Sequence, residues 1–208
     1  MKVTLKVLLV AAVILLAYMC YRSIMTSIEF DEEKKSREDA IIARLIEIRK
    51  AQIEYKNVHK VHAGSFDDLI KFLNEQELPF LTKEGVLTDE QLEKGMTEQE
   101  AVKKGLIKRD TFWVIAKDTL FGKNYDAGDI RYVPGTQLQF HMDTATLSSN
   151  SGYEIKVFEA SVKYDEYLDD LDHQLLVNAI DKVEKQSKFP GLKVGSLTEI
   201  NNNAGNWE

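Results

Sequence analysis

The sequence predicts an α+β protein in which an N-terminal transmembrane helix continues into a long amphipathic helix packed on a small antiparallel β-sheet, with a C-terminal helix. Three observations support this fold class. Residues 7–21 form an apolar run without charge, apolar residues recur at helical spacing farther along the same stretch, and short β-branched and aromatic segments follow in the second half. A chain of 208 residues fits one membrane segment and one domain.

Four regions are expected along the chain. Residues 1–28 form the N-terminal membrane anchor, residues 29–40 a charged helical stalk, residues 41–194 an α+β extracytoplasmic domain, and residues 195–208 a polar tail. Within the domain, residues 79–105 are expected to form a helical insertion on the surface.

The apolar run is long enough to cross a bilayer. From Leu5 to Met25 it has about 21 residues, or roughly 30 Å of helix. Lys2 and Lys6 place the amino end in the cytoplasm by the positive-inside rule. The domain would then lie outside the cytoplasm, and in the periplasm if the envelope has an outer membrane.

Two alternatives stay open for this segment. A cleaved secretory signal would explain the basic start, but bulky Tyr18 and Arg22 stand where small residues precede a cleavage site. A lipoprotein would acylate Cys20, the only cysteine, yet Met19 before it is also large. With one cysteine, no disulfide can form within the chain. We therefore expect an uncleaved anchor that contacts membrane lipid through residues 5–25.

Net charge argues against a nucleic-acid partner. The chain carries a formal charge of −7, and its first 28 residues contribute +3, so the remaining residues carry −10. Phosphate binding needs clustered Lys and Arg, which an acidic domain does not supply.

The stalk and the helix after it are expected to continue the membrane helix, because no Gly or Pro occurs before Gly64. Residues 29–39 are almost entirely charged, which is typical of a solvated helix. Farther along, Ile41, Leu45 and Ile48 keep near-heptad spacing, whereas Gln52 interrupts the apolar line. The stripe is wide enough for a helix packed on a domain.

The middle of the chain predicts short helices. Ser65 is placed to cap a helix over residues 66–74. Thr88 and Thr97 are each followed three residues later by Gln or Glu, as in a capping box. Both short helices belong to the insertion. It is the best candidate in the chain for a partner-facing surface, although a passive loop is the favoured interpretation.

Strands are expected after the insertion. The segments bounded by turn residues are 111–116, 130–133, 137–142 and 153–160, with a turn at Pro134-Gly135 and another at residues 148–152. A helix is expected from Asp165 until before Pro190, and the tail is expected to be extended or loose.

Candidate sites are few, and the sequence predicts no catalytic, cofactor-binding or metal-binding residue. It contains no Gly-rich phosphate loop and no Gly-x-Ser-x-Gly motif. Two histidines near a helix end, beside Asp67 and Asp68, could hold a metal, but are better explained as exposed side chains. His141 lies in an expected strand, and His173 among three aspartates is best explained as a surface residue. The histidines at the helix end are His59 and His62.

One loop has the composition of an oxygen-rich calcium site. Asn124, Asp126, Gly128 and Asp129 supply carboxylate and amide oxygens, but lack the regular spacing of a calcium loop. A plain Gly-Asp turn is the favoured interpretation.

The order of these parts resembles the type IV pilin and pseudopilin superfamily. The segment Arg44–Tyr55 (RLIEIRKAQIEY), followed by Gly64 and Asp68-Leu69, is similar to the end of the family's N-terminal helix. The resemblance implies a pilin-like domain in an envelope assembly. The family's processing site is missing, because no Gly precedes the apolar run and no Glu lies within it.

The function expected from these features is not enzymatic. The chain would be a single-span membrane protein whose outer domain is a structural or scaffolding component of an envelope, secretion or pilus-like assembly, with other envelope proteins as partners. The alternative is a membrane-anchored ligand-binding or sensor domain, with residues 118–129 or the insertion as its site.

Overall fold

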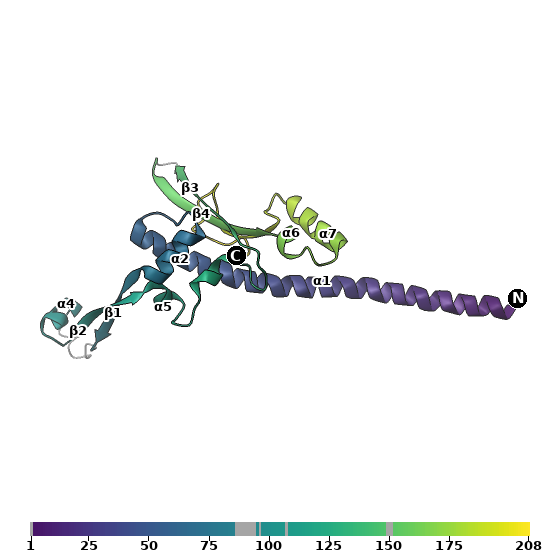
Figure 1. Cartoon of the computed structure of the whole chain (residues 1–208), viewed down its shortest axis with the longest axis horizontal. Helices are drawn as coiled ribbons and strands as arrows, with labels where there is room; N and C mark the ends of the chain where they lie inside the picture. The colour runs from purple at the N-terminus through teal and green to yellow at the C-terminus, as the bar shows by residue number, and fades with distance from the viewer. Residues whose placement is uncertain (1, 86–94, 96, 107, 149–151) are drawn as a thin grey trace. The chain divides into compact units, whose positions relative to one another are not determined.

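The computed structural model describes residues 2–85, 95, 97–106, 108–148 and 152–208 (Figure 1). The protein is α+β, with a long N-terminal helix, small antiparallel sheets and further helices. It divides into two compact units. The first contains Met1–Phe66 and Asp129–Glu208, and the second contains Asp67–Gly128.

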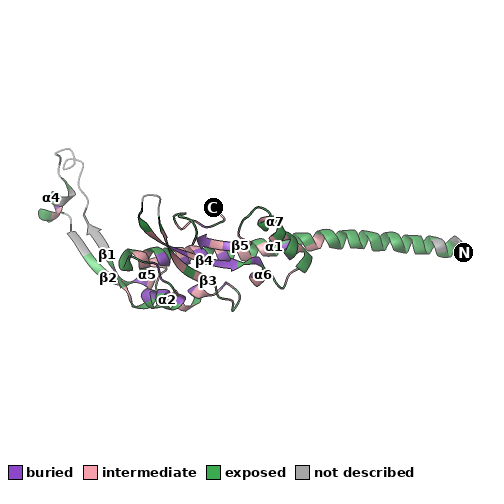
Figure 2. Cartoon of the chain, turned by 90° about the horizontal axis from the view of Figure 1, so that it is seen from above, coloured by how far each residue is buried: buried purple, intermediate pink, exposed green. Residues whose placement is uncertain are grey.

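Helix α1 runs without interruption from Lys2 to His59. Its length follows from the absence of Gly and Pro, and it ends where Lys60 takes a positive φ of 64°. Residues 6–24 of α1 are all exposed, whereas Ile41, Leu45 and Ile48 are buried. Figure 2 shows this change from exposed to buried along the helix. The helix therefore exposes apolar residues at one end and buries them at the other.

The first unit contains a three-stranded antiparallel sheet. Its strands are β3 (His141–Ser148), β4 (Glu154–Lys163) and β5 (Gly191–Gly195), in the order β3-β4-β5. Gly195 has φ of +75°, and a Cβ there would lie 2.1 Å from the carbonyl oxygen of Phe158. Only glycine permits this close approach of β5 to the central strand.

The C-terminal helical region differs from the single helix predicted from Asp165. Two helices occur there, α6 (Tyr164–Tyr167) and α7 (His173–Glu184). Asp172 separates them because its side chain accepts a hydrogen bond from the backbone N–H of Leu175 at 3.0 Å. This is the N-cap geometry, which starts a new helix.

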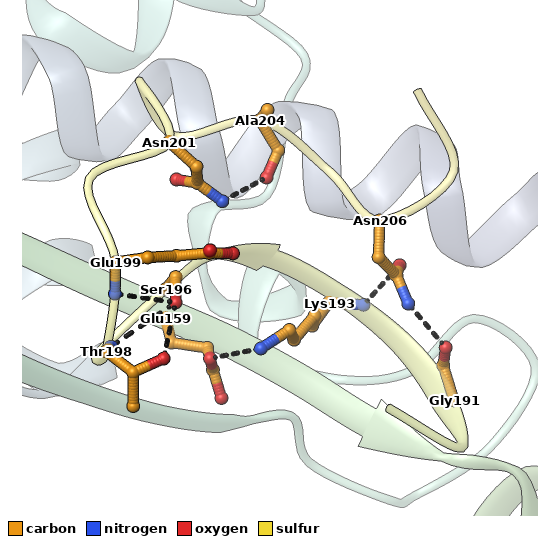
Figure 3. A network of polar contacts seen from close by, with 9 residues as sticks. All are labelled: Glu159, Gly191, Lys193, Ser196, Thr198, Glu199, Asn201, Ala204 and Asn206. Atoms are coloured by element: carbon orange, nitrogen blue, oxygen red, sulfur yellow. Dashed lines mark hydrogen bonds and ion pairs between the residues drawn. The ribbon is translucent and has the colours of Figure 1, made fainter. Parts of the chain in front are cut away.

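The tail was predicted to be extended or loose, and this prediction is wrong. Asn206 donates from its side chain to the carbonyl of Gly191 at 2.9 Å and accepts from the backbone N–H of Lys193 at 3.0 Å (Figure 3). The N–H of Gly195 donates to the carbonyl of Ala204 at 3.0 Å. The polar side chains replace strand partners along β5, so the expected boundary at 194/195 cuts through an ordered element.

Two of the predicted strands are wrong. The segment 130–133 overlaps a 3-10 helix, η1 (Ala127–Arg131), and the segment 137–142 is mostly irregular, with one isolated bridge from Tyr132 to Gln139. Ile130 is buried without a strand partner. Its apolar side chain therefore indicates a core position, not a strand. The turn at Pro134-Gly135 is confirmed.

The second unit is built on a two-stranded ribbon. Its elements are α2 (Phe66–Glu75), β1 (Glu77–Glu84), α4 (Glu98–Lys103), β2 (Lys108–Ile115) and α5 (Ala116–Leu120), with β1 antiparallel to β2. The helix expected at 66–74 and the strand expected at 111–116 are confirmed in their central parts.

The helical insertion expected at 79–105 is wrong for its first residues, which belong to β1. Pro79 is tolerated there because a two-stranded ribbon has free edges, where a missing N–H costs no pairing. The helix expected after Thr97 is confirmed as α4, with both hydrogen bonds of the capping box. The helix expected after Thr88 lies outside the described residues.

Candidate functional site

The first candidate site is the apolar surface at the start of α1. Among the described residues, one helix is long and apolar enough to cross a membrane, and its most apolar window has a mean hydropathy of 2.2 with none of it buried. An N-terminal signal sequence meets the same criterion. The large exposed side chains include Val7, Leu8, Leu9, Val10, Val13, Ile14, Leu15, Leu16, Tyr18, Met19, Tyr21 and Ile24.

The charged stalk was predicted to be solvated; most of its residues are exposed, but one side of it is packed against other segments. Phe30 is only 6% exposed. The Arg37 guanidinium bonds both carboxylate oxygens of Asp170, at 2.5 and 2.8 Å, and the carbonyl oxygen of Tyr167 at 2.7 Å. The ammonium of Lys34 lies 5.0 Å from the ring centre of Tyr164. Helix α6 and the segment after it therefore pack against this part of α1.

The contact between Arg37 and Asp170 changes the proton affinity of both groups. The hydrogen bond to Asp170 raises the pKa of Arg37 above its usual range, although burial opposes the change. The same bond lowers the pKa of the Asp170 carboxyl. Both groups are thus held in their charged forms, which suits a bidentate pair.

Replacing this arginine tests how strongly the pair holds the two segments together. We expect Arg37→Gln to lower the free energy of unfolding by about 1 kcal/mol, because Asp170 is more than half exposed and solvent screens the pair. Urea unfolding of the full chain in detergent measures the change. Lys35→Gln removes an exposed charge two residues away and should change little. An equal loss in both variants would contradict the assignment.

His62 was expected to be exposed at a helix end, but it is buried. Its side chain is 6% exposed and its ring centre lies 4.8 Å from that of Phe158. Neither ring nitrogen makes a hydrogen bond in the described structure. Burial lowers the pKa of His62 to about 4, and the charge of Lys56 adds to the decrease. His62 is therefore a neutral core residue in contact with the central strand.

Stability should depend on pH through His62. The unfolded chain binds a proton near pH 6.5 and the folded chain only near pH 4, so acidification favours the unfolded state. We expect a loss of roughly 3 kcal/mol as pH falls from about 6.5 to 4, at 1.36 kcal/mol per pKa unit. Chemical unfolding at several pH values measures it. His62→Phe keeps a ring against Phe158 and should flatten this slope; an unchanged slope would assign it to other groups.

The other histidines make ordinary surface contacts. His59 packs on Tyr55, with ring centres 4.4 Å apart. The Nε2 of His141 lies 2.6 Å from a carboxylate oxygen of Glu166. Burial raises the pKa of Glu166, but the hydrogen bonds from His141 and from the N–H of Lys163 outweigh it and lower the pKa overall. His173 is the exposed first residue of α7.

The calcium-like loop has the geometry of a turn. Asp126 accepts a hydrogen bond from the backbone N–H of Gly128 at 2.8 Å, which is an Asx-turn. Phe121 and Tyr125 stack beside it with ring centres 4.4 Å apart. Within the described ranges, no group of three His, Cys, Asp or Glu side chains is placed to hold a metal ion.

A groove that the sequence did not indicate lies in the first unit. It has a volume of about 660 Å³ and is lined by α1, the end of the α7 region, β5 and the tail, including Ile42 and Trp207. Two of its lysines are ion-paired: Lys193 bonds Glu159 at 2.9 Å (Figure 3), and Lys34 bonds Glu38 at 2.8 Å. Its lining comes from segments far apart in the chain, so no local pattern could reveal it.

The chain matches no protein-family model, and no curated protein or solved structure is similar to it. The resemblance to pilins therefore stays a prediction. The features that bear on function are the two ends of α1 and the segments that pack on it.

Proposed function

We propose that this chain is a non-enzymatic, single-span membrane protein that serves as a structural component of an envelope assembly. One observation carries the proposal. A single continuous helix exposes a run of large apolar side chains at one end and supplies buried core residues at the other. An exposed apolar surface of this extent is unfavourable in water, because the cost rises with the area exposed. A bilayer would cover it.

The orientation follows from the same helix. Lys2 and Lys6 lie at the start of the apolar run, whereas the first Lys or Arg after Thr26 is Lys34, eight residues farther along the chain. The positive-inside rule then places the amino end in the cytoplasm and the folded units outside it. A mechanical role is supported because the helix that anchors the chain is also part of the folded core, so force on the domain reaches the membrane directly.

A pilin-like arrangement is part of the proposal. It is supported by the buried end of α1 in the same unit as an antiparallel sheet, with Lys56 donating to the carbonyl of Lys156 in β4 at 2.9 Å. Because the apolar run and the core residues belong to one continuous helix, we propose that the chain keeps this run uncleaved.

Membrane extraction tests the proposal. The full chain should stay in the membrane pellet after alkaline carbonate treatment. The double change Val10→Arg and Ile14→Arg should release it, since each arginine costs about 3 kcal/mol at the centre of a span. Ser36→Arg adds a charge outside the span and should leave the chain in the pellet. Release of the unaltered chain would refute the anchor.

The alternative is a membrane-anchored ligand-binding domain. The groove of about 660 Å³ supports this alternative, whereas residues 118–129 offer only the turn around Asp126. Thermal unfolding of the full chain with calcium and with small polar ligands distinguishes the two. A ligand that raises the midpoint would favour the alternative, and Trp207→Ala in the groove wall should remove that increase.

A further inference from the structure

We infer that one zwitterionic phospholipid binds in a cleft between α1 and the first turn of α7. The inference rests on the proposed function, because it requires α1 to span a membrane. The cleft has a volume of about 430 Å³. Its walls are Tyr18, Met19, Arg22, Ser23 and Thr26 of α1, and Asp172, Gln174 and Leu175 of the α7 region.

The position of the cleft along α1 coincides with the outer edge of the bilayer. A span needs about 20 residues at 1.5 Å each. A span that begins at Leu5, between Lys2 and Lys6, ends near Met25. The cleft occupies Tyr18 to Thr26, the last two turns of this segment, where acyl chains give way to headgroups. The first turn of α7 would therefore lie at the outer membrane surface.

The apolar part of the cleft suits an acyl chain. Tyr18 and Met19 are both more than half exposed, and Leu175 faces them across the cleft. In a bilayer these side chains would contact lipid tails. Tyr18 would keep its hydroxyl near the headgroups, where tyrosine is enriched in membrane proteins.

The polar part of the cleft carries one charge of each sign. Arg22 makes no side-chain hydrogen bond or ion pair with any described residue; only its backbone carbonyl is used, by the hydroxyl of Thr26 at 2.9 Å. A phosphodiester would neutralise this arginine. Asp172 caps α7 with Oδ1 and has no described partner for Oδ2, which leaves that oxygen available to an ammonium group.

The surroundings disfavour an anionic lipid. A neighbouring cavity of about 650 Å³ is lined by further acids, Glu29, Glu32, Glu33 and Asp170; Arg37 pairs with the last two, and the four acids exceed this one positive charge by three. Their negative potential opposes a headgroup with net negative charge and favours one whose ammonium points toward Asp172. Phosphatidylethanolamine has the required chemistry, with the phosphate at Arg22 and the ammonium at Asp172.

Native mass spectrometry of the full chain in mild detergent tests the inference. The chain is titrated with phosphatidylethanolamine or phosphatidylglycerol of the same acyl chains. We expect one bound phosphatidylethanolamine, retained a few-fold better than phosphatidylglycerol, because only its ammonium group can pair with the exposed Asp172. Glycerophosphoethanolamine, which has the headgroup without the chains, should not displace it.

Asp172→Asn should reduce this preference, whereas Arg22→Gln should reduce the retention of both lipids severalfold, because both lipids carry the phosphate. Asparagine caps helices as well as aspartate does, so Asp172→Asn keeps the start of α7 intact. Lys35→Gln and Asp169→Asn are the matched controls and should retain the lipid. Equal retention of the two lipids, or unchanged binding in both cleft variants, would overturn the inference. A chain that resists carbonate but shows no preference refutes only this inference, whereas carbonate release refutes the proposed function itself.

Discussion

The substitution Ile48→Pro is expected to unfold the first unit, which contains the three-stranded sheet. Ile48 is fully buried in the interior of α1. Proline there removes one backbone hydrogen bond and clashes with the preceding turn, at a cost of about 3 kcal/mol or more. Losing much of the isoleucine side chain adds about 2 kcal/mol. Domains of this size are stable by only about 5–15 kcal/mol, so most of the stability of this unit is lost.

Lys35→Pro is the matched control for Ile48→Pro on the same helix. Lys35 is exposed, so proline there removes one helical hydrogen bond and clashes with the preceding turn, but it removes no buried side chain. It should weaken the contact between Arg37 and Asp170 while β4 stays folded. Hydrogen exchange of the β4 amides measures the difference. Equal exchange in the two variants would show that α1 is not divided into an anchoring part and a core part.

Gln52→Leu should destabilise the same unit strongly, although it replaces a polar residue by an apolar one. The side chain of Gln52 is fully buried. Its Nε2 donates to the carbonyl of Ala63 at 3.0 Å, and its Oε1 accepts from the N–H of Ala63 at 2.9 Å. Leucine leaves both backbone groups of Ala63 buried without partners. Each such group costs about 1–3 kcal/mol, so we expect a loss of about 4 kcal/mol.

Thermal and urea unfolding of the full chain in detergent measure this loss. Asn57→Leu removes an exposed amide from the same helix, whose bond to Glu54 is 3.2 Å long. It should change the midpoint little. A loss of equal size in the two variants would mean that the bonds to Ala63 contribute nothing specific to the fold.

At Gln52 the structure differs from what the local sequence pattern predicts. In the sequence it interrupts an apolar stripe that predicts a core helix. In the structure it occupies that stripe fully buried, because its amide pairs with a backbone eleven residues later. A partner at that separation has no periodic signature, so the sequence alone could not assign the pairing.

The long helix was predictable and its charged segment was not. Continuity follows from the absence of Gly and Pro, and the buried positions Ile41, Leu45 and Ile48 follow from their spacing. The charges at 29–39 predict a solvated surface, yet Arg37 bonds Asp170, a residue 133 positions away. A charge pattern in the sequence predicts ion pairs between neighbouring residues of one helix. It does not predict this pair, because tertiary packing brings Asp170 close to Arg37.

Strand β5 and the tail were missed for a related reason. The sequence Gly191–Gly195 has two glycines in five residues, which is a poor strand by propensity. Pairing with β4 and the side-chain bonds from Asn206 decide its structure. The groove beside β5 could not be predicted for the same reason, because its walls come from segments far apart in the chain.

The central claim is that α1 serves as membrane anchor and domain core in one uncleaved chain. Intact mass of the chain recovered from the carbonate-resistant membrane fraction tests it most directly. The account predicts about 23.8 kDa, the mass of all 208 residues. A membrane fraction without the chain, or a product lacking the first 20 or so residues, would contradict it.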